Sequence, residues 1–153
     1  MARSVRVLAV DYGDRRVGLA VSDELGIAAH GLPTLQVKSR KEAARAVVHA
    51  ANQHGVSRIV IGLPLNMDGT EGPRALVTRE FGRECEDVLA AERSEVRIVM
   101  LDERLTTMRA RAALREQGLR ERSQRAKVDR VSATVLLQDY LSAQSATEGS
   151  NDG

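Results

Sequence analysis

Three short runs of β-branched and apolar residues within the first 37 positions constrain the fold more than any other feature of this sequence. The runs cover residues 5–10, 17–22 and 27–37. The first two are separated by a few turn-forming residues and predict a β-hairpin. Gly31 and Pro33 in the third run indicate a bend or an edge strand, because proline cannot donate a ladder hydrogen bond. We therefore expect the chain to begin as an antiparallel sheet.

After these runs the pattern changes to an alternation of helices and strands. The expected helices lie at 40–54, about 73–92, about 106–117 and about 128–143, and the expected strands at 58–62 and 96–101. Gly55 stands where the first helix should stop, and Pro73 suits the first turn of the second. The order predicts an α/β fold with a mixed five-stranded sheet, three antiparallel strands followed by parallel ones, flanked by helices.

Length and composition favour a single domain without a membrane partner. The chain has 153 residues, of which 42% are hydrophobic, enough for a sizeable core. We predict one domain at 1–144 and a disordered tail at 145–153. No apolar run approaches the roughly 20 residues that cross a bilayer, and Asp11 and Asp14 interrupt the apolar stretch near the N-terminus. We expect no signal peptide and a cytoplasmic protein.

Basic residues are concentrated in one segment, although the formal net charge is only +2. Between positions 109 and 130, three acidic residues face a larger set of basic ones. The basic residues are Arg109, Arg111, Arg115, Arg120, Arg122, Arg125, Lys127 and Arg130. Such a segment is an electrostatic footprint for phosphates, although arginine-rich helices are also often only solvated faces. Aromatic residues make up 2% of the chain, which argues against a platform that stacks single-stranded bases.

Acidic residues stand where the expected strands end. Asp11 follows the first strand, and Asp102 and Glu103 follow the last; Asp129 begins the final helix. In open α/β sheets, sites form beyond the carboxyl ends of the strands. Carboxylates gathered there repel one another, so a cluster needs a cation, and hard oxygen ligands suit Mg²⁺ or Mn²⁺. Two such ions can activate a water and stabilise the leaving oxygen in phosphodiester cleavage.

Each of these acids also has a purely structural explanation. Asp11 could cap the hairpin turn, and the negative charge of Asp129 could interact favourably with the dipole of its helix. Asp102 and Glu103 point to opposite faces if the strand persists, so only one of them should join the site. Their spacing does not choose between them.

Three other features give weaker signals. The loop NMDGTEGP either is a plain surface loop or holds a substrate phosphate on its amides and the following helix N-terminus, with Asn66 as the contacting side chain. Cys85 is the only cysteine and is expected to be a half-buried helix residue, with an intermolecular bond as the alternative. The histidines give no metal-binding pattern.

Four blocks of sequence together resemble the YqgF/RuvX family, whose members are described as Holliday junction resolvases or as nucleases acting on pre-16S rRNA. The blocks are LAVDYGDRRVGLAVSD (8–23), IVIGLPLNMDGTEGP (59–73), LDERLTT (101–107) and KVDRVSATVLLQDYL (127–141). They occur in the family order and span nearly the whole chain. The resemblance implies an RNase H-like fold, and it selects Glu103 rather than Asp102, giving Asp11, Glu103 and Asp129 as catalytic and metal-binding acids.

The resemblance also implies a nucleic-acid substrate, and two Mg²⁺ or Mn²⁺ ions as cofactors. We expect a metal-dependent endonuclease that acts in 5′-end processing of pre-16S rRNA, as a monomer or a homodimer. The expected nucleic-acid contacts are Asn66, Arg104, Arg122, Arg125, Lys127 and Arg130. The segment 119–127 would close on the substrate as a mobile flap.

Three alternatives remain open at this point. A resolvase of four-way DNA would need a dimer, because it makes two coordinated cuts. A non-catalytic nucleic-acid-binding module would leave the acids with structural roles only. The segment DYGDRRVG also resembles the first phosphate loop of actin-like ATPases, but those proteins place two such domains around the nucleotide.

Overall fold

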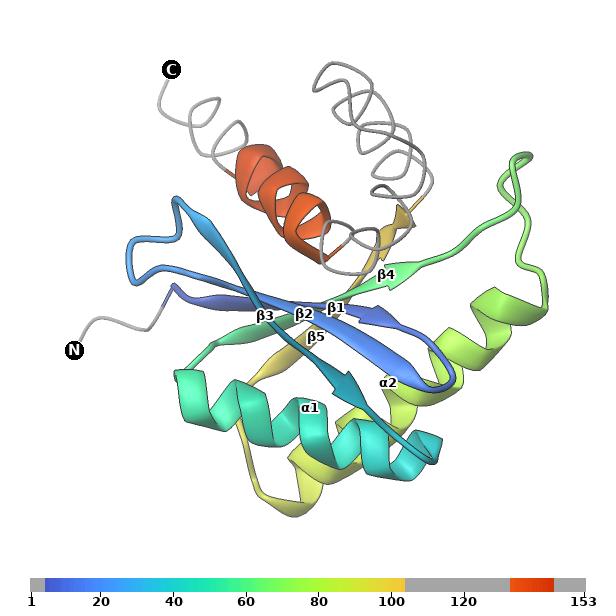
Figure 1. The fold of residues 1–153 in the computed structure, drawn as a ribbon, viewed down its shortest axis with the longest axis horizontal. Coiled ribbons are helices and arrows are strands. Elements are labelled where there is room, and N and C mark those ends of the chain that lie inside the picture. The colour runs from blue at the N-terminus through green and yellow to red at the C-terminus, as the bar shows by residue number, and fades with distance from the viewer. Residues whose placement is uncertain (1–4, 104–132, 145–153) are drawn as a thin grey trace.

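The computed structural model describes residues 5–103 and 133–144, and within them five strands form one mixed sheet (Figure 1). The strands are β1 (Val7–Tyr12), β2 (Arg16–Ser22), β3 (Ala29–Gln36), β4 (Arg58–Leu63) and β5 (Arg97–Asp102). Their order across the sheet is β3-β2-β1-β4-β5. β1 therefore lies at the centre of the sheet, between β2 and β4.

The pairing confirms the predicted change from antiparallel to parallel strands. β1 pairs antiparallel with β2, and β2 pairs antiparallel with β3. β1 then pairs in parallel with β4, and β4 with β5. β3 is an edge strand, as its glycine and proline predicted. The predicted mixed five-stranded sheet is thus confirmed.

Two helices connect the parallel strands, and each carries the end signals expected from its sequence. In α1 (Arg40–His54) the Ser39 side chain accepts a hydrogen bond from the Glu42 amide, and Gly55 ends the helix in a left-handed conformation with φ 62°. In α2 (Pro73–Ala91) Pro73 occupies the first turn, where its missing N–H costs nothing. Both helices confirm the predicted ranges to within one residue.

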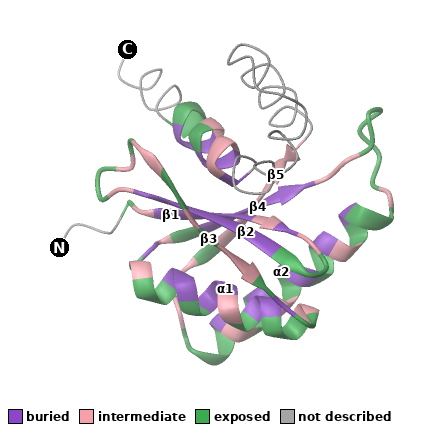
Figure 2. Ribbon diagram, in the orientation of Figure 1, coloured by how far each residue is buried: buried purple, intermediate pink, exposed green. Residues whose placement is uncertain are grey.

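Helices cover both faces of the sheet, which gives the protein two hydrophobic layers (Figures 1 and 2). On one face, α1 and α2 pack against sheet side chains such as Val10 and Ile61, and Phe81 of α2 lies in this layer. On the other, the helical residues 133–144 pack against β1, β2 and β4. Arg58 of β4 also donates a hydrogen bond to the Tyr140 hydroxyl, which ties this helix to the sheet.

Two of the differences between the predicted and the observed strand limits have clear physical reasons. β1 runs through Asp11 to Tyr12, because the ladder with β2 continues through the pair Asp11–Gly18. β3 begins at Ala29 because Asp23 holds the preceding loop: its side chain accepts from the Ile27 amide, and its own amide donates to the Ala28 carbonyl. The first of these differences places Asp11 in a rigid strand.

Several predictions lie outside the described residues. They are the helix at about 106–117, the flap at 119–127, the basic segment at 109–130 and the tail at 145–153. The extent of the domain, 1–144, also stays a prediction. Among the residues that the structure describes, no helix is both long enough and apolar enough to cross a membrane.

Candidate active site

Strand alternation brings two of the predicted acids to one face of the sheet. Val10 and Tyr12 belong to the layer under α1 and α2, so Asp11 between them faces the helix at 133–144. In β5, Val99 and Leu101 contact that same helix-covered layer, and Glu103, directly after the strand, lies beside Gly62 together with Leu136 of that layer. Asp102 has the opposite parity. The structure therefore separates the two neighbouring acids that their spacing left undecided.

A glycine in β4, the strand between β1 and β5, allows the Glu103 carboxylate to approach Asp11. Gly62 lies near the carboxyl end of β4, between β1 and β5. A Cβ atom at this position would lie 3.2 Å from Glu103 Oε2 and 3.4 Å from Leu136 Cδ2. The Glu103 carboxylate thus lies directly against the backbone of Gly62, and Leu136 of the helix at 133–144 lies beside it.

Burial and charge both act on this carboxylate. Desolvation is the larger cause that raises the pKa of Glu103, the negative charge of Asp11 adds to it, and the Arg74 guanidinium partly offsets it. The resulting pKa is about 7, against an ordinary value of 4.5. A cation placed between the two carboxylates would reverse this effect. Hard oxygen donors at a partly buried, negatively charged position fit a divalent ion such as Mg²⁺ or Mn²⁺.

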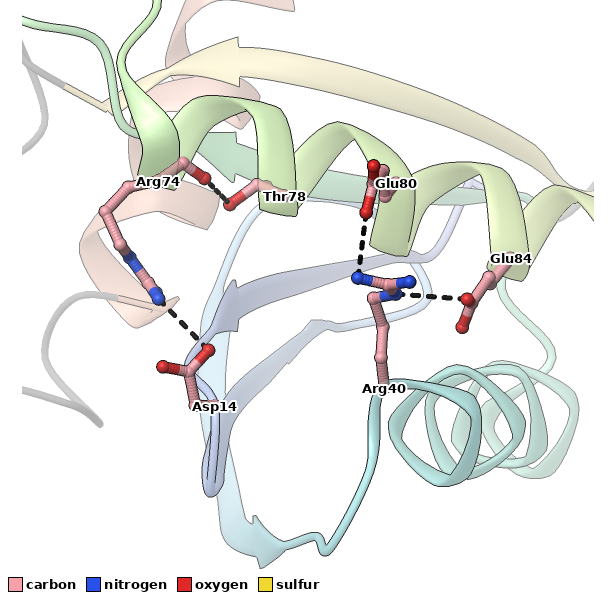
Figure 3. Close-up of polar contacts among 6 residues, drawn as sticks. All are labelled: Asp14, Arg40, Arg74, Thr78, Glu80 and Glu84. Atoms are coloured by element: carbon pink, nitrogen blue, oxygen red, sulfur yellow. Dashed lines mark hydrogen bonds and ion pairs between the residues drawn. The ribbon is translucent and has the colours of Figure 1, made fainter.

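Next to Asp11 the surface is hollowed by a polar depression of about 300 Å³. It is lined by Asp11, Tyr12, Gly13, Asp14, Arg16, Gly18 and Arg74. Arg74 comes from the first turn of α2 and donates one hydrogen bond to the Tyr12 carbonyl (3.1 Å) and one to Asp14 Oδ1 (3.2 Å; Figure 3). The depression therefore combines acidic and basic groups at the end of β1.

Packing under the sheet holds this end of β1 in place. The Tyr12 ring stacks on Phe81 of α2, with centroids 4.2 Å apart and planes within 12°. On the same side, Arg40 of α1 forms ion pairs with Glu80 and Glu84 of α2, which tie the two helices together (Figure 3). Asp11 thus lies at a strand end that is fixed by aromatic stacking and by helix packing.

The loop between β4 and α2 is organised by Asn66. Its side-chain amide donates to the Thr70 hydroxyl at 3.0 Å, and its backbone carbonyl accepts from the Gly69 amide. A Cβ at Gly72 would lie 3.1 Å from Asn66 Oδ1, so glycine leaves room for this side chain. Asn66 is exposed, and its role as a nucleic-acid contact stays a prediction.

The remaining predicted site residues lie outside the described residues. They are Asp129, Arg104, Arg122, Arg125, Lys127 and Arg130. Within residues 5–103 and 133–144, no group of three or more histidine, cysteine or acidic side chains could hold a metal ion, so the described part of the site is the pair Asp11 and Glu103. The third predicted ligand, Asp129, stays a prediction.

Sequence reasoning missed one residue of this site and misjudged the burial of another. Arg74 was not singled out; the available signal was an arginine in the first turn of a helix that begins beside the strand ends. Cys85 is fully buried in α2 rather than half-buried, and desolvation raises the pKa of its thiol to about 12. A thiol held in this way stays protonated and inert.

A family model described as "RuvX: Holliday junction resolvase" matches residues 5–143. The chain belongs to the RuvX family. A relative from Ruminiclostridium cellulolyticum is 40% identical over 138 residues, which cover 90% of this chain and 94% of the relative. Another from Myxococcus xanthus is 40% identical over 139 residues, covering 91% and 89%. Both carry the name "Putative pre-16S rRNA nuclease".

Solved structures agree with the fold of the RuvX family. RuvC of T. thermophilus, solved in complex with a Holliday junction substrate, superposes with a TM-score of 0.57 at 17% identity, covering 94% of this chain and 97% of that one. The large terminase nuclease of the thermophilic phage G20c gives a TM-score of 0.54 at 10% identity, covering 88% and 81%. The RNase H-like architecture expected from the sequence is thus confirmed.

The close approach at Gly62 gives this RuvX chain a test of the acid pair. Replacing Gly62 with valine should push the Glu103 carboxylate away from Asp11, because a side chain there meets both Glu103 and Leu136. We expect the affinity for Mn²⁺ to fall at least tenfold, a loss typical of disturbed metal sites. Calorimetric titration of the metal measures it. Valine at His30, an exposed position of the edge strand β3, is the control and should leave the affinity unchanged.

Proposed function

We propose that this protein is a metal-dependent nuclease that hydrolyses nucleic-acid phosphodiesters. We further propose that its main substrate is the 5′ leader of pre-16S rRNA. The observation that carries the proposal is the meeting of Asp11 and Glu103 on one face at the carboxyl ends of β1 and β5. Membership of the RuvX family supports hydrolysis of nucleic acid, and the names of the curated relatives favour the ribosomal substrate.

In this proposal Asp11, Glu103 and Asp129 hold two divalent ions, Mg²⁺ or Mn²⁺. Bound there, such ions lower the pKa of an attacking water and neutralise charge on the leaving oxygen. The protein's own contribution is geometric and electrostatic. β1 fixes Asp11 within a paired strand, Gly62 lets Glu103 approach, and partial burial of Glu103 strengthens every charge interaction at this edge.

A four-way DNA junction is the second candidate substrate. The family model is described as a Holliday junction resolvase, and the RuvC structure with a related fold contains a junction. Resolution requires two coordinated cuts and therefore a dimer, whereas cleavage of an RNA leader does not. The same acids would serve either substrate. A cleavage assay, and not the chemistry of the two carboxylates, therefore distinguishes RNA from junction DNA.

The test is a cleavage panel with labelled pre-16S leader RNA, single-stranded RNA, single-stranded DNA and a four-way junction, each with Mg²⁺ or Mn²⁺. Wild-type protein should cut the leader RNA. Asp11→Asn should lower the rate by at least about 100-fold, because even disturbing the outer partners of a metal ligand costs roughly 10- to 100-fold. Its RNA binding should be retained, since the variant removes a negative charge.

Asp87→Asn is the matched control, because Asp87 is exposed on α2 and the variant makes the same charge change. It should cut at the wild-type rate. Cutting of the junction in preference to RNA would reassign the substrate to DNA. Binding without cleavage by any metal-loaded sample would favour a non-catalytic module, and an unaltered rate in Asp11→Asn would remove the acid pair from the chemistry.

A further inference from the structure

The depression beside Asp11 holds two arginines whose positions the acid pair does not explain. Arg16 comes from the start of β2 and Arg74 from the first turn of α2, and both line the depression together with Asp11. Metal binding requires negative charge, so arginines are not needed to assemble the carboxylates. Cations next to a carboxylate site are expected where an anionic group of the substrate must also be held.

The Arg74 guanidinium is held in place by a hydrogen bond but remains accessible to a ligand. Its hydrogen bond to the Tyr12 carbonyl directs it to the end of β1, close to Asp11. Its other contact is an ion pair with Asp14, and the side chains are 50% and 73% exposed. An ion pair as exposed as this contributes little to stability, so an incoming anion can replace the carboxylate at small cost.

Phosphate, the anionic group of a nucleic-acid substrate, fits this arrangement. A guanidinium offers several N–H donors in a planar fork that fits phosphate oxygens, and such charge-assisted hydrogen bonds are among the strongest. The depression of about 300 Å³ is large enough for a nucleotide's phosphate and sugar and is open beside Asp11. Arg74 also acts on the acid pair directly, because its charge opposes the rise in the pKa of Glu103.

We propose that Arg74, with Arg16 beside it in the depression, binds a backbone phosphate of the substrate strand next to the bond that is cut. In the absence of substrate Asp14 forms an ion pair with the Arg74 guanidinium, and the phosphate displaces it. The inference rests on the proposed nuclease function and adds to it a binding position for the nucleic-acid strand beside Asp11. The hairpin turn between β1 and β2 then acts as part of the substrate site.

Binding of a fluorescently labelled pre-16S leader RNA tests the proposal separately from cleavage. Measurements use anisotropy in the Asp11→Asn background, so the RNA stays intact. Arg74→Gln should weaken binding about tenfold, the value of one charge-assisted hydrogen bond. It should also lower the slope of log affinity against log salt by about one. Arg74→Lys should recover part of the affinity, because the charge remains while the fork is lost.

Arg83→Gln is the matched control, since Arg83 is an exposed arginine of the same helix that lies outside the depression. It should change binding much less than Arg74→Gln. Equal losses in the two variants would reduce the effect to net charge and overturn the proposal, as would wild-type affinity in Arg74→Gln. Circular dichroism of each variant checks that the fold is intact.

The role of Asp14 is tested by a double-mutant cycle. Asp14→Asn should tighten RNA binding because it frees Arg74, and this gain should disappear when Arg74 is already glutamine. Additive effects would show that Asp14 acts only through its own charge and would overturn the displacement. Should wild-type protein cut none of the substrates, the binding results still decide this inference. If wild type cuts RNA while Arg74→Gln binds normally, the inference alone fails.

Discussion

Replacing Glu103 with glutamine is expected to stabilise the metal-free protein at pH 8 by as much as about 3 kcal/mol. The substitution removes a carboxylate whose ionisation is opposed by burial and by the charge of Asp11. An equilibrium unfolding titration in urea with EDTA measures the gain. The same variant should lose metal-dependent cleavage, so that stability and activity change in opposite directions.

The sign of this effect follows from the direction of the pKa shift. The pKa of Glu103 in the folded protein is about 7, above its ordinary value of 4.5. Below pH 4.5 the carboxyl is protonated in both states and costs nothing. Between about pH 4.5 and 7 it ionises in the unfolded chain first, so the stability of the wild type falls as pH rises. Above pH 7 the full penalty is present.

Two comparisons make the Glu103 prediction specific. At pH 4.5 the wild type and Glu103→Gln should have nearly the same free energy of unfolding. Glu95→Gln, at an exposed position before β5, should leave the pH dependence of the wild type unchanged. A wild-type protein whose stability does not fall between pH 4.5 and 7 would contradict the burial of the Glu103 carboxylate and the added effect of the Asp11 charge. Saturating Mn²⁺ should remove the advantage of the variant, because the variant lacks one of the proposed metal ligands.

Replacing Phe81 with alanine should destabilise the protein by about 3–5 kcal/mol. Phe81 is fully buried in α2 and stacks on Tyr12, so truncation leaves a large cavity under the end of β1. Chemical denaturation followed by circular dichroism measures this loss. Because Tyr12 follows Asp11 in the strand, we also expect weaker metal binding in the folded fraction.

Two other substitutions serve as comparisons for Phe81→Ala. Phe81→Leu should destabilise less, because it preserves most of the volume while removing the ring stack. Leu76→Ala changes an exposed side chain of the same helix and should have little effect on stability. Metal binding in Phe81→Leu separates the roles of volume and stacking. A loss as small for Phe81→Ala as for Leu76→Ala would contradict the packing described here.

Most of the fold could be predicted because local signals and global pattern agreed. Gly55, Pro73 and the apolar runs marked the elements at positions where backbone conformation leaves few choices. The limits of β1 were less accessible, because an acidic residue after an apolar run is typical of a turn. In the folded protein the ladder with β2 continues through Asp11. This pairing depends on residues of β2, which lie outside the local sequence pattern around Asp11.

The candidate site was predictable in part. Asp11 and Glu103 could be named, but the choice of Glu103 over Asp102 required the family resemblance, because the parity of β5 depends on which face each helix covers. Arg74 escaped notice because its importance comes from contacts with Tyr12 and Asp14, which are 62 and 60 positions away. Contacts across such a separation leave no local trace in a single sequence.

The placement of Leu136 against Gly62 and Glu103 has a consequence for the order of events during synthesis. The strands and the first two helices are complete once the ribosome has passed residue 102, but one wall of the acid pair is supplied by a side chain made much later. An unfinished chain therefore exposes the face that carries Asp11 and cannot shield Glu103 from water. Nuclease competence should appear late in translation, when the helix at 133–144 closes over that face.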